Sequence, residues 1–427
     1  MREAVLRCQL PNGLLILLKE IHSSPIISQW IWYRVGSRDE TPGRTGISHW
    51  CEHMLFKGTP QFPSGELDRM ISRDGGFWNA FTYLDWTTYF ETMPAEKIEL
   101  ALRLEADRML HGLFEASEVA SERTVIISER QGEENEPLFR LSEEVQAAAF
   151  RIHPYHHEIV GDLADLQSMQ RDDLYQHYRT YYQPNNAVLA LAGDFDQEKM
   201  LERLQDLYAG LPAGAPVRRL ERPEPAQCGE RRLMVEGPGE TTFVQVSYRA
   251  PAGNDADFFT CTVLDSLLTG PSNLNMFGGG ISNKTSRLYQ SLVERELAVT
   301  VHGGLSATVD PYLYTISLTV HPAATPEKCL QALDEEITKL QEAPPAAAAL
   351  ERAVKQARAL FAYGSESISN QAFWLGFAEM FASYDWFLEY VDRLAAVTPQ
   401  AVQRMAQTCL RPQNRTIGIY LPTQSND

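Results

Sequence analysis

The chain has 427 residues, 44% of them hydrophobic and 22% charged, and its formal net charge is −18. This composition is typical of a globular protein with a substantial core, and no apolar run approaches the roughly 18 residues of a membrane span. The acidity argues against nucleic acids and anionic membranes as partners, because both require basic patches, but it is compatible with cationic peptides. Six scattered cysteines without a metal or disulfide spacing, and a beginning that reads as strand and turn rather than signal peptide, predict a cytoplasmic protein.

The first motif along the chain, HWCEH at 49–53, places two imidazoles and a carboxylate on one helical turn. His49 and His53 are four residues apart and therefore share a helix face, close enough to hold one metal ion. Glu52 lies beside them, where it can take a proton from a metal-bound water. The order H-x-x-E-H is that of the inverted zincins. A glycine and a serine within 46–48 open the helix, and a glycine and a proline within 58–60 close it.

A catalytic zinc site requires a third protein ligand and leaves one position open for water. The segment 115–135 reads as a helix in which three apolar residues are expected to face the core, namely Val119, Val125 and Ile126. Glu122 and Glu129 are seven residues apart and share a face of this helix. One of the two is expected to be the third ligand and the other to orient a histidine from behind. Spacing alone leaves open which is which.

Three further histidines form a second cluster in the segment HPYHHE, namely His153, His156 and His157. They fall in a loop that precedes a helix expected at 162–179. We therefore expect structural or surface roles for them rather than a second metal site.

The chain repeats one unit, with an offset that drifts from about 215 to about 230 residues. Three pairs of segments match, namely 29–34 with 244–249, 75–85 with 303–310, and 183–193 with 411–422. Both copies mix alternating strands with helices. At the offset of 215 the three motif positions fall on Leu264, Leu267 and Leu268. The second copy thus keeps the pattern of a buried helix face without the ligating groups.

Between the copies, residues 209–230 are rich in proline, glycine and alanine and lack hydrophobic periodicity, which is typical of a linker. The predicted organisation is a catalytic zinc-binding domain at 1–210, a linker at 211–230 and a second domain without metal ligands at 231–427. The fold class is α+β: two homologous α/β sandwich domains, each an antiparallel sheet packed with helices, related by internal duplication.

A near match to the phosphate-binding loop G-x-x-x-x-G-K-[ST] ends at Lys284 and Thr285. Asn283 stands where the motif needs its second glycine, and the preceding text reads as helix and loop rather than as a buried strand. We therefore interpret residues 278–285 as a flexible loop and not as a nucleotide site.

Four blocks of the sequence resemble the pitrilysin/insulinase family of zinc metallopeptidases, especially its short bacterial and mitochondrial-processing-peptidase-like branch: GISHWCEHMLFKGTP, GGFWNAFTYLDWTTYFE, ERTVIISERQGEENEP and HPYHHEIVGD. The resemblance covers essentially the whole chain. It implies that Glu129 is the third zinc ligand and Glu122 the auxiliary glutamate. It also implies that Asn79 and Ala80 lie on an edge strand that pairs with an extended peptide substrate. One such chain forms half of a clamshell.

The second copy departs from the family pattern at one point. Many members carry an arginine and a tyrosine a few residues apart, which bind the carbonyl and backbone of the substrate. In the equivalent stretch this chain has Leu292 or Val293 in place of the arginine and Val299 in place of the tyrosine. The hydrogen-bond donors on the oxyanion side are therefore missing.

The sequence thus predicts a zinc-dependent endopeptidase that cleaves extended peptides or short unfolded polypeptides. His49, His53 and Glu129 are expected to hold Zn²⁺, with Glu52 as the general base. We expect the chain to be the catalytic subunit of a heteromeric complex, whose homologous metal-free partner carries the Arg/Tyr pair. A homodimer is the alternative assembly, and a noncatalytic scaffold that retains the peptidase fold is the alternative function.

Overall fold

A computed structural model of the chain describes residues 5–219, 221–275 and 280–423. The chain forms two compact units, each built from three stretches of sequence. Unit 1 contains residues 1–131, 157–222 and 366–384, and unit 2 contains residues 132–156, 223–365 and 385–427. No helix in the described part of the chain is both long and apolar enough to cross a membrane.

Unit 1 is built on a six-stranded sheet with the order β1-β2-β6-β3-β5-β4. Its strands are β1 (Leu6–Gln9), β2 (Leu15–Glu20), β3 (Ile26–Tyr33), β4 (Phe77–Thr82), β5 (Thr87–Pro94) and β6 (Ala187–Gly193). All neighbouring strands run antiparallel except β2 and β6, which are parallel. The sheet is therefore mixed, whereas the sequence predicted an antiparallel one. The alternation of apolar and polar residues does not fix strand direction, because side chains alternate with a period of two residues in both parallel and antiparallel strands.

Alternating side chains explain why β3 lies at the centre of this sheet. Trp30 and Trp32 point to one face, where both rings contact Phe373 of α12 (Ile368–Phe381). Gln29 points to the other face and donates a hydrogen bond to the carbonyl of Ala101 in α3 (Glu99–His111). Helices thus cover both faces of the strand, which is why nearly every residue of β3 is buried.

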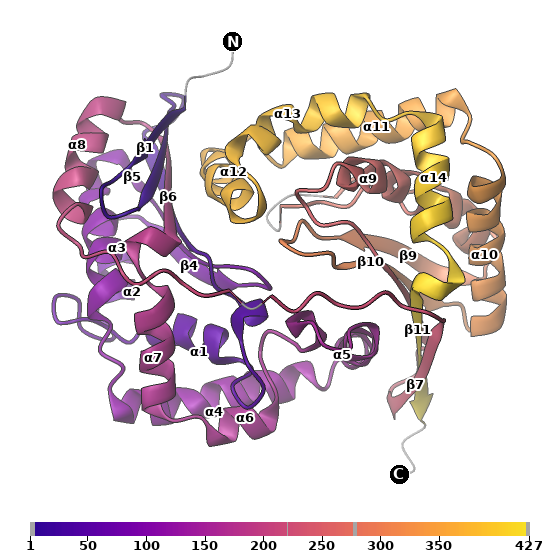
Figure 1. Cartoon of the computed structure of the whole chain (residues 1–427), viewed down its shortest axis with the longest axis horizontal. Helices are drawn as coiled ribbons and strands as arrows, with labels where there is room; N and C mark the ends of the chain where they lie inside the picture. The colour runs from indigo at the N-terminus through magenta and orange to yellow at the C-terminus, as the bar shows by residue number, and fades with distance from the viewer. Residues whose placement is uncertain (1–4, 220, 276–279, 424–427) are drawn as a thin grey trace. The chain divides into compact units, whose positions relative to one another are not determined.

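The remaining helices of unit 1 surround the same sheet (Figure 1). They are α1 (Ile47–Met54), α2 (Leu67–Arg73), α4 (Ala116–Glu133), α6 (Leu163–Ser168), α7 (Arg171–Tyr181) and α8 (Gln197–Tyr208), with short 3₁₀ turns η1 (Ser37–Asp39), η2 (Ala95–Lys97) and η4 (Pro184–Asn186). Helix α1 packs against α7 and β4, and this packing places it beneath one edge of the sheet. The helix expected at 162–179 is split in two between α6 and α7.

Unit 2 repeats the architecture with a five-stranded sheet in the order β7-β11-β8-β10-β9. Its strands are β7 (Arg231–Pro238), β8 (Phe243–Arg249), β9 (Ala298–Leu305), β10 (Leu313–Val320) and β11 (Arg415–Thr423). Its helical elements are α5 (Pro137–Ala149), α9 (Asp257–Leu268), α10 (Pro326–Glu342), α11 (Ala347–Tyr363), α13 (Tyr384–Ala395), α14 (Pro399–Cys409), the π-helix η5 (Tyr289–Val293) and the turns η3 (Pro154–His156) and η6 (Pro412–Asn414). Helices α9, α10, α11, α13 and α14 gather on one side of this sheet (Figure 1). The duplication is visible strand by strand, since β7 and β11 again form the one parallel pair.

Each sequence half gives one helix to the unit built by the other half. Helix α5 precedes the linker but packs on β7, β8 and β11, where Leu141 and Val145 form a buried cluster with Tyr420. Helix α12 follows the linker but packs on β3 and β6. The compact units are therefore not the continuous stretches 1–210 and 231–427, because a helix from the other half covers one face of each sheet.

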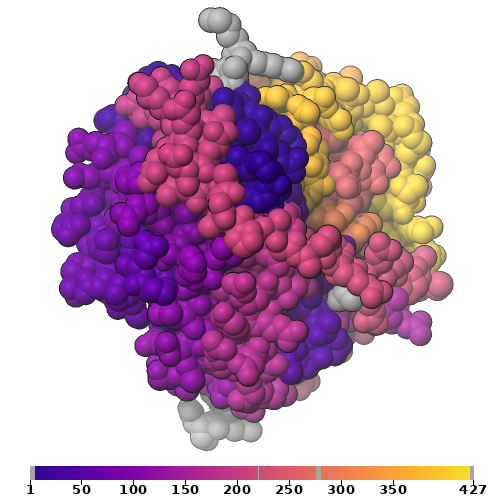
Figure 2. Space-filling model, turned by 60° about the vertical axis from the view of Figure 1, so that its left-hand side comes forward, coloured from indigo at the N-terminus to yellow at the C-terminus, as the bar shows by residue number. Residues whose placement is uncertain are grey.

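The expected linker at 211–230 contains no helix or strand among its described residues, and most of them are exposed. In the space-filling view it is a pink track over the surface (Figure 2). Arg219 pairs with Asp39 of unit 1 at 2.8 Å. Glu224 accepts hydrogen bonds from the backbone N–H groups of Arg151 and Ile152 in unit 2, each at 2.7 Å. Both ends of the segment are thus anchored to the unit that they adjoin.

Candidate metal centre

Helix α1 carries the two histidines, and its start is fixed by the backbone. Gly46 precedes the helix at φ +83°, and a Cβ there would lie 2.4 Å from the carbonyl oxygen of Val160, so only glycine fits. The buried carboxylate of Glu40 accepts hydrogen bonds from the N–H groups of Gly46 at 2.9 Å and Ser48 at 2.8 Å. These bonds satisfy N–H groups at the helix start that have no partner within the helix. Burial nevertheless raises the pKa of Glu40 to about 8.

Two contacts hold helix α4 against α1 and the residues that follow α1. The guanidinium of Arg123 lies over the ring of Trp50, 5.4 Å from its centroid. Lys57 forms an ion pair with Glu122 at 2.5 Å. Val119 and Ile126 are buried as predicted, but the prediction for Val125 is wrong, since it is 42% exposed. The helix therefore presents a narrower apolar face and turns its glutamates toward α1.

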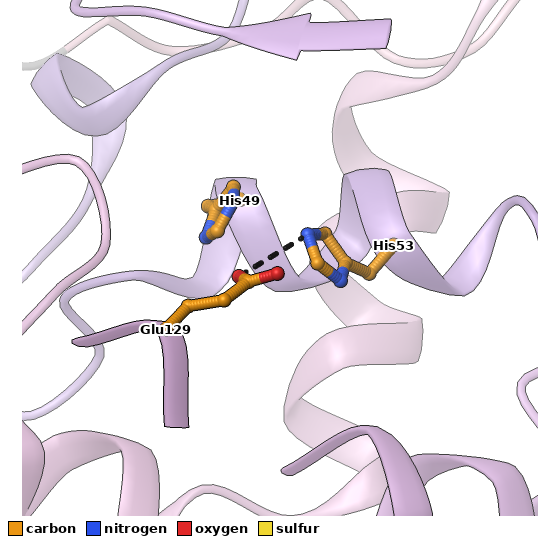
Figure 3. Close-up of side chains that lie close together, drawn as sticks. All are labelled: His49, His53 and Glu129. Carbon is orange, nitrogen blue, oxygen red and sulfur yellow. Dashed lines mark ion pairs between the residues drawn. The ribbon is translucent and has the colours of Figure 1, made fainter. Parts of the chain in front are cut away.

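The side chains of His49, His53 and Glu129 converge between α1 and α4 (Figure 3). Their ligand atoms lie within 4.8 Å of one another, and this is the one metal-binding group found among the described residues. The two imidazole rings are 4.6 Å apart at their centroids, and Nε2 of His53 lies 3.7 Å from Glu129. Two imidazoles and a carboxylate suit zinc, whose catalytic sites hold three such ligands and keep a fourth position open.

The protonation of the two histidines fits this role. Burial lowers the pKa of His49 to about 3, so its imidazole is neutral at physiological pH, and its buried Nδ1 has no hydrogen-bond partner in the described structure. Burial alone would lower the pKa of His53, but the hydrogen bond with Glu122 and the charges of Glu129 and Glu52 raise it. A proton therefore competes with a metal ion at His53 as the pH falls.

Glu122 holds His53 from behind. Nδ1 of His53 donates to Oε1 of Glu122 at 2.8 Å, which leaves the Nε2 lone pair facing Glu129. Burial alone would raise the pKa of Glu122, but hydrogen bonds with His53 and Lys57 lower it, so the acceptor is ionised. This carboxylate–histidine arrangement is the usual support of a metal-bound imidazole. The structure thus places Glu129 in the ligand group and Glu122 behind it.

Glu52 is 7% exposed and lies on the same helix turn. Its Oε2 accepts a hydrogen bond of 2.6 Å from the hydroxyl of Thr82, the last residue of β4. Burial raises the pKa of Glu52 to about 7, although the hydrogen bond with Thr82 and the charge of His53 act in the opposite direction. A carboxyl with a pKa near neutrality can both accept and return a proton.

Strand β4 is an edge of the unit 1 sheet and ends at Thr82, the residue that contacts Glu52. Asn79 and Ala80 lie in this strand, and the N–H of Ala80 donates to the side chain of Asn79 at 2.9 Å. An edge strand leaves backbone groups available for pairing with another extended chain. A peptide on this edge would lie beside Glu52.

The corresponding helix of unit 2, α9, is buried from Phe258 to its end at Leu268. Leu264, Leu267 and Leu268 occupy the motif positions, and none is more than 5% exposed. In the segment where the family resemblance places donors, Leu292 is fully buried and Val299 is 51% exposed on the edge strand β9. Unit 2 thus keeps the scaffold without the polar groups.

The histidines of HPYHHE make structural contacts, one with a distant residue and two within the segment. Nε2 of His153 lies 3.1 Å from Asp310, and Nδ1 of His156 donates to the carbonyl of His153 at 2.9 Å. Nδ1 of His157 lies 3.1 Å from the carbonyl of Glu158. Cys51, inside the motif, is buried, and its thiol donates to a backbone carbonyl of α7.

Three residues of this site escaped the sequence analysis, namely Glu40, Lys57 and Thr82. Each makes its contact across a turn or between two elements of secondary structure. The periodicity of the sequence does not predict such contacts. A weak signal existed for Thr82, because it directly follows Asn79, Ala80 and Phe81 in an alternating strand. The near match to a phosphate loop falls partly outside the described residues, since residues 276–279 are not among them.

Comparisons with known proteins indicate the family of this chain. Residues 15–163 match the family profile described as insulinase (peptidase family M16), and residues 168–357 match the profile described as the peptidase M16 inactive domain. The chain is 31% identical to the zinc protease PqqE of Helicobacter pylori over 61% of this chain and 60% of that protein. It is 28% identical to a probable mitochondrial-processing peptidase subunit beta of Arabidopsis thaliana over 78% of this chain and 62% of that protein. These two alignments thus span less than two thirds of each relative.

A solved structure resembles the chain over nearly its whole length. The crystal structure of a protease from Helicobacter pylori superimposes with a TM-score of 0.91 and 25% identity, covering 98% of this chain and 100% of that one. The strand order and the covering helices of both units are therefore an arrangement shared with a known protease.

Proposed function

The chain belongs to the insulinase (M16) family of peptidases, and on that premise we propose that it is a zinc-dependent endopeptidase acting on extended peptides or short unfolded polypeptides. The observation that carries the proposal is the convergence of His49, His53 and Glu129 beside Glu52, which is bonded to the end of an open edge strand. Catalytic zinc, when bound there, supplies a Lewis acid that polarises a carbonyl and lowers the pKa of water.

The side chains of the chain itself carry the proton. Glu52, with a pKa of about 7, takes a proton from the attacking water and passes it to the leaving amine. The hydroxyl of Thr82 holds one oxygen of Glu52, which leaves the other oxygen to exchange the proton. Glu122 keeps the Nδ1 proton of His53 in place, which holds the ring in one orientation throughout the cycle.

The substrate is bound by backbone pairing in this proposal. An extended peptide adds to β4 at Asn79 and Ala80, and the side chain of Asn79 releases the N–H of Ala80 to a substrate carbonyl. Pairing of this kind reads the extended shape of a peptide rather than its sequence. It excludes folded proteins, because their backbone groups are already paired.

Hydrolysis of a quenched peptide, measured together with zinc content, tests the proposal. The wild type is expected to bind one zinc per chain and cleave the peptide, and Glu52→Gln to keep the zinc while losing roughly 10²–10⁴-fold in rate. Glu198→Gln, an exposed glutamate of α8, serves as the matched control. If the wild type bound no zinc and were as inactive as Glu52→Gln, the chain would be a noncatalytic scaffold and not a peptidase.

We also propose that the chain is the catalytic subunit of a heteromeric complex. The aliphatic Leu292, Val293 and Val299 provide no donor for a substrate carbonyl, so a homologous metal-free subunit would supply the Arg/Tyr pair. A relative named as one subunit of a processing peptidase is consistent with such an assembly. The mass of the native complex tests it: a fully active species that contains only this chain would favour the homodimer.

A reducing, cytoplasmic location remains part of the proposal. All six cysteines are free thiols, and four of them are buried. Alkylation of the protein isolated from its host, followed by mass measurement, should find six reactive thiols after denaturation and no disulfide.

A further inference from the structure

The two sheets of the duplicated fold differ by one strand. The order β2-β6-β3-β5-β4 in unit 1 corresponds to β7-β11-β8-β10-β9 in unit 2, and the parallel pairs β2–β6 and β7–β11 take the same place in each. In unit 1, β1 adds an antiparallel strand outside β2, with Leu6 opposite Leu18 and Gln9 opposite Leu15. Within the described part of the chain no strand takes this position in unit 2. Strand β7 is therefore an edge of its sheet (Figure 1).

The segment that precedes β7 does not fill this position, because it is held elsewhere. In unit 1, β1 comes directly before β2 and folds back on it. Before β7 lies the linker, in which Glu224 accepts hydrogen bonds from the N–H groups of Ile152 and His153. The side chain of Gln227 donates to the carbonyl of Arg415 at 2.7 Å. A hairpin like that of β1 and β2 would break these contacts, so the outer backbone groups of β7 are left to a strand from another chain.

The side chains of β7 alternate between a covered and an open face. Leu233 and Val235 pack against the buried cluster formed with α5. Arg232, Met234 and Glu236 point to the other face and are exposed. Met234 is 65% exposed, and Glu236 forms no ion pair with any residue that the structure describes. The open face of this edge thus presents one apolar side chain between a base and an acid.

This order of charges is self-complementary. Two antiparallel copies of a strand related by a two-fold axis pair about one residue, because only side chains of the same face stand opposite each other. Pairing about Met234 places Arg232 of each copy opposite Glu236 of the other. Pairing about the residue before or after Met234 would instead place Glu230 or Met234 opposite Glu236. Opposite charges across a strand pair are stabilising and like charges are destabilising, so one register is favoured.

We propose that two copies of this chain associate through β7, in an antiparallel pair centred on Met234 that joins their two unit 2 sheets. The second copy gives β7 the antiparallel neighbour that β1 gives β2 in unit 1. The two Met234 side chains cover each other, and the flexible thioether adapts to such a contact. Arg232 contacts Glu230 within its own chain, but its side chain is 58% exposed and remains available to Glu236 of the second copy.

The pairing uses unit 2 alone and does not depend on the proposed zinc chemistry. In the proposed heteromeric complex it would bring together two copies of this chain. One strand pair buries less surface than a standard interface, so we expect a dissociation constant of about 1–100 µM. Because the charges are exposed, added salt should weaken the association.

Sedimentation equilibrium of the full-length protein, at concentrations on both sides of this constant, tests the proposal. Arg232→Glu and Glu236→Arg each place like charges opposite each other twice in the pair, and each should raise the dissociation constant at least about 10-fold. Both positions are exposed, so neither variant should disturb folding. Arg404→Glu, a charge reversal at an exposed position of α14, is the matched control and should leave the constant unchanged.

An equimolar mixture of the two β7 variants provides the sharpest readout. Unlike charges face each other again when one variant pairs with the other, so the mixture should associate as the wild type does, and the double variant should associate with itself. A wild type that stays monomeric at every concentration overturns the proposal. A dimer that both single variants leave unchanged also overturns it, because that dimer forms through another surface. Failure of the mixture to associate would show that the strands do not pair about Met234 and would overturn it as well.

Discussion

Helices α1 and α9 occupy equivalent places in the two units but differ in chemistry. In α1 the motif positions carry two histidines and a glutamate, and in α9 they carry three leucines. All residues of α9 after Asp257 are buried, whereas α1 leaves both histidines partly exposed. The fold therefore needs only an apolar face at this place, and the polar groups of α1 are present for another reason.

Two buried acids accompany that chemistry in unit 1. The buried carboxyl groups of Glu40 and Glu52 have pKa values of about 8 and 7, because burial disfavours their charged forms. The carboxylate that accepts a backbone bond at the start of α9, that of Asp255, is exposed instead. The comparison teaches that the scaffold accommodates leucines at the motif positions, whereas the copy with the metal group carries buried acids whose ionisation burial opposes.

Separating the two sequence halves tests whether the units are as independent as their symmetry suggests. The fragments 1–210 and 231–427 should each fail to fold alone, because each sheet loses a covering helix. For unit 1 the loss includes Phe373, Trp374 and Phe377, whose burial contributes about 1.5–3 kcal/mol each. Circular dichroism and solubility measure the effect, and coexpression should restore both. A folded, zinc-binding fragment 1–210 would break this account.

Replacing the two histidines of α1 by the leucines found at these positions in α9 tests whether the polar face of α1 serves metal binding only. The double substitution His49→Leu and His53→Leu should reduce zinc from one per chain to none and abolish hydrolysis. The metal-free variant should melt no lower than the metal-free wild type, since leucines fill this place in α9. Metal analysis and thermal unfolding provide the readouts, with His302→Leu, an exposed residue of β9, as control. Retained zinc would place the metal elsewhere.

The buried acid before α1 should make unit 1 the pH-sensitive copy. The pKa of the Glu40 carboxyl is near the ordinary value of 4.5 in the unfolded chain and about 8 in the folded chain. The contribution of this group to the free energy of unfolding is therefore greatest below pH 4.5 and falls as the pH rises to about 8. The loss is on the order of 4 kcal/mol. Denaturant unfolding of metal-free protein at pH 5 and pH 8 should show a smaller difference in Glu40→Gln.

Asp255→Asn is the control for that experiment, because its carboxylate is exposed and its substitution should leave the pH dependence unchanged. An unaltered pH dependence in Glu40→Gln would mean that the N–H groups of Gly46 and Ser48 keep the carboxylate ionised.

The smallest expected effect concerns the support behind the metal group. Glu122→Gln removes the ionised acceptor of His53 and should weaken zinc binding about 10–100-fold without abolishing it. Competition with a zinc chelator measures the affinity, and Glu115→Gln, an exposed glutamate before α4, should leave it unchanged. Complete loss of zinc would instead make Glu122 a direct ligand.

The local features of this fold could be predicted from the sequence. The strands at 29–34 and 244–249 were expected from alternation and lie within β3 and β8. Spacing alone also put His49 and His53 on one face. The choice between Glu122 and Glu129 required the family resemblance, because both share a face of α4 and only the packing against α1 distinguishes them.

The exchange of α5 and α12 could not be predicted in the same way. Both helices are amphipathic or apolar, and a pattern of burial says that a face is covered but not by which sheet. The burial of Val125 was predicted wrongly for a similar reason, since the width of the buried face of α4 depends on what packs against it. Long-range packing decided each of these cases.

The location of bound zinc tests the central claim most directly. Anomalous diffraction at the zinc edge, from crystals of the protein reconstituted with one equivalent of zinc, should show a single site in each chain, bound by His49, His53 and Glu129. Unit 2 should show none at Leu264 and Leu268. A zinc ion bound elsewhere, or no ordered zinc in any chain, would contradict the account.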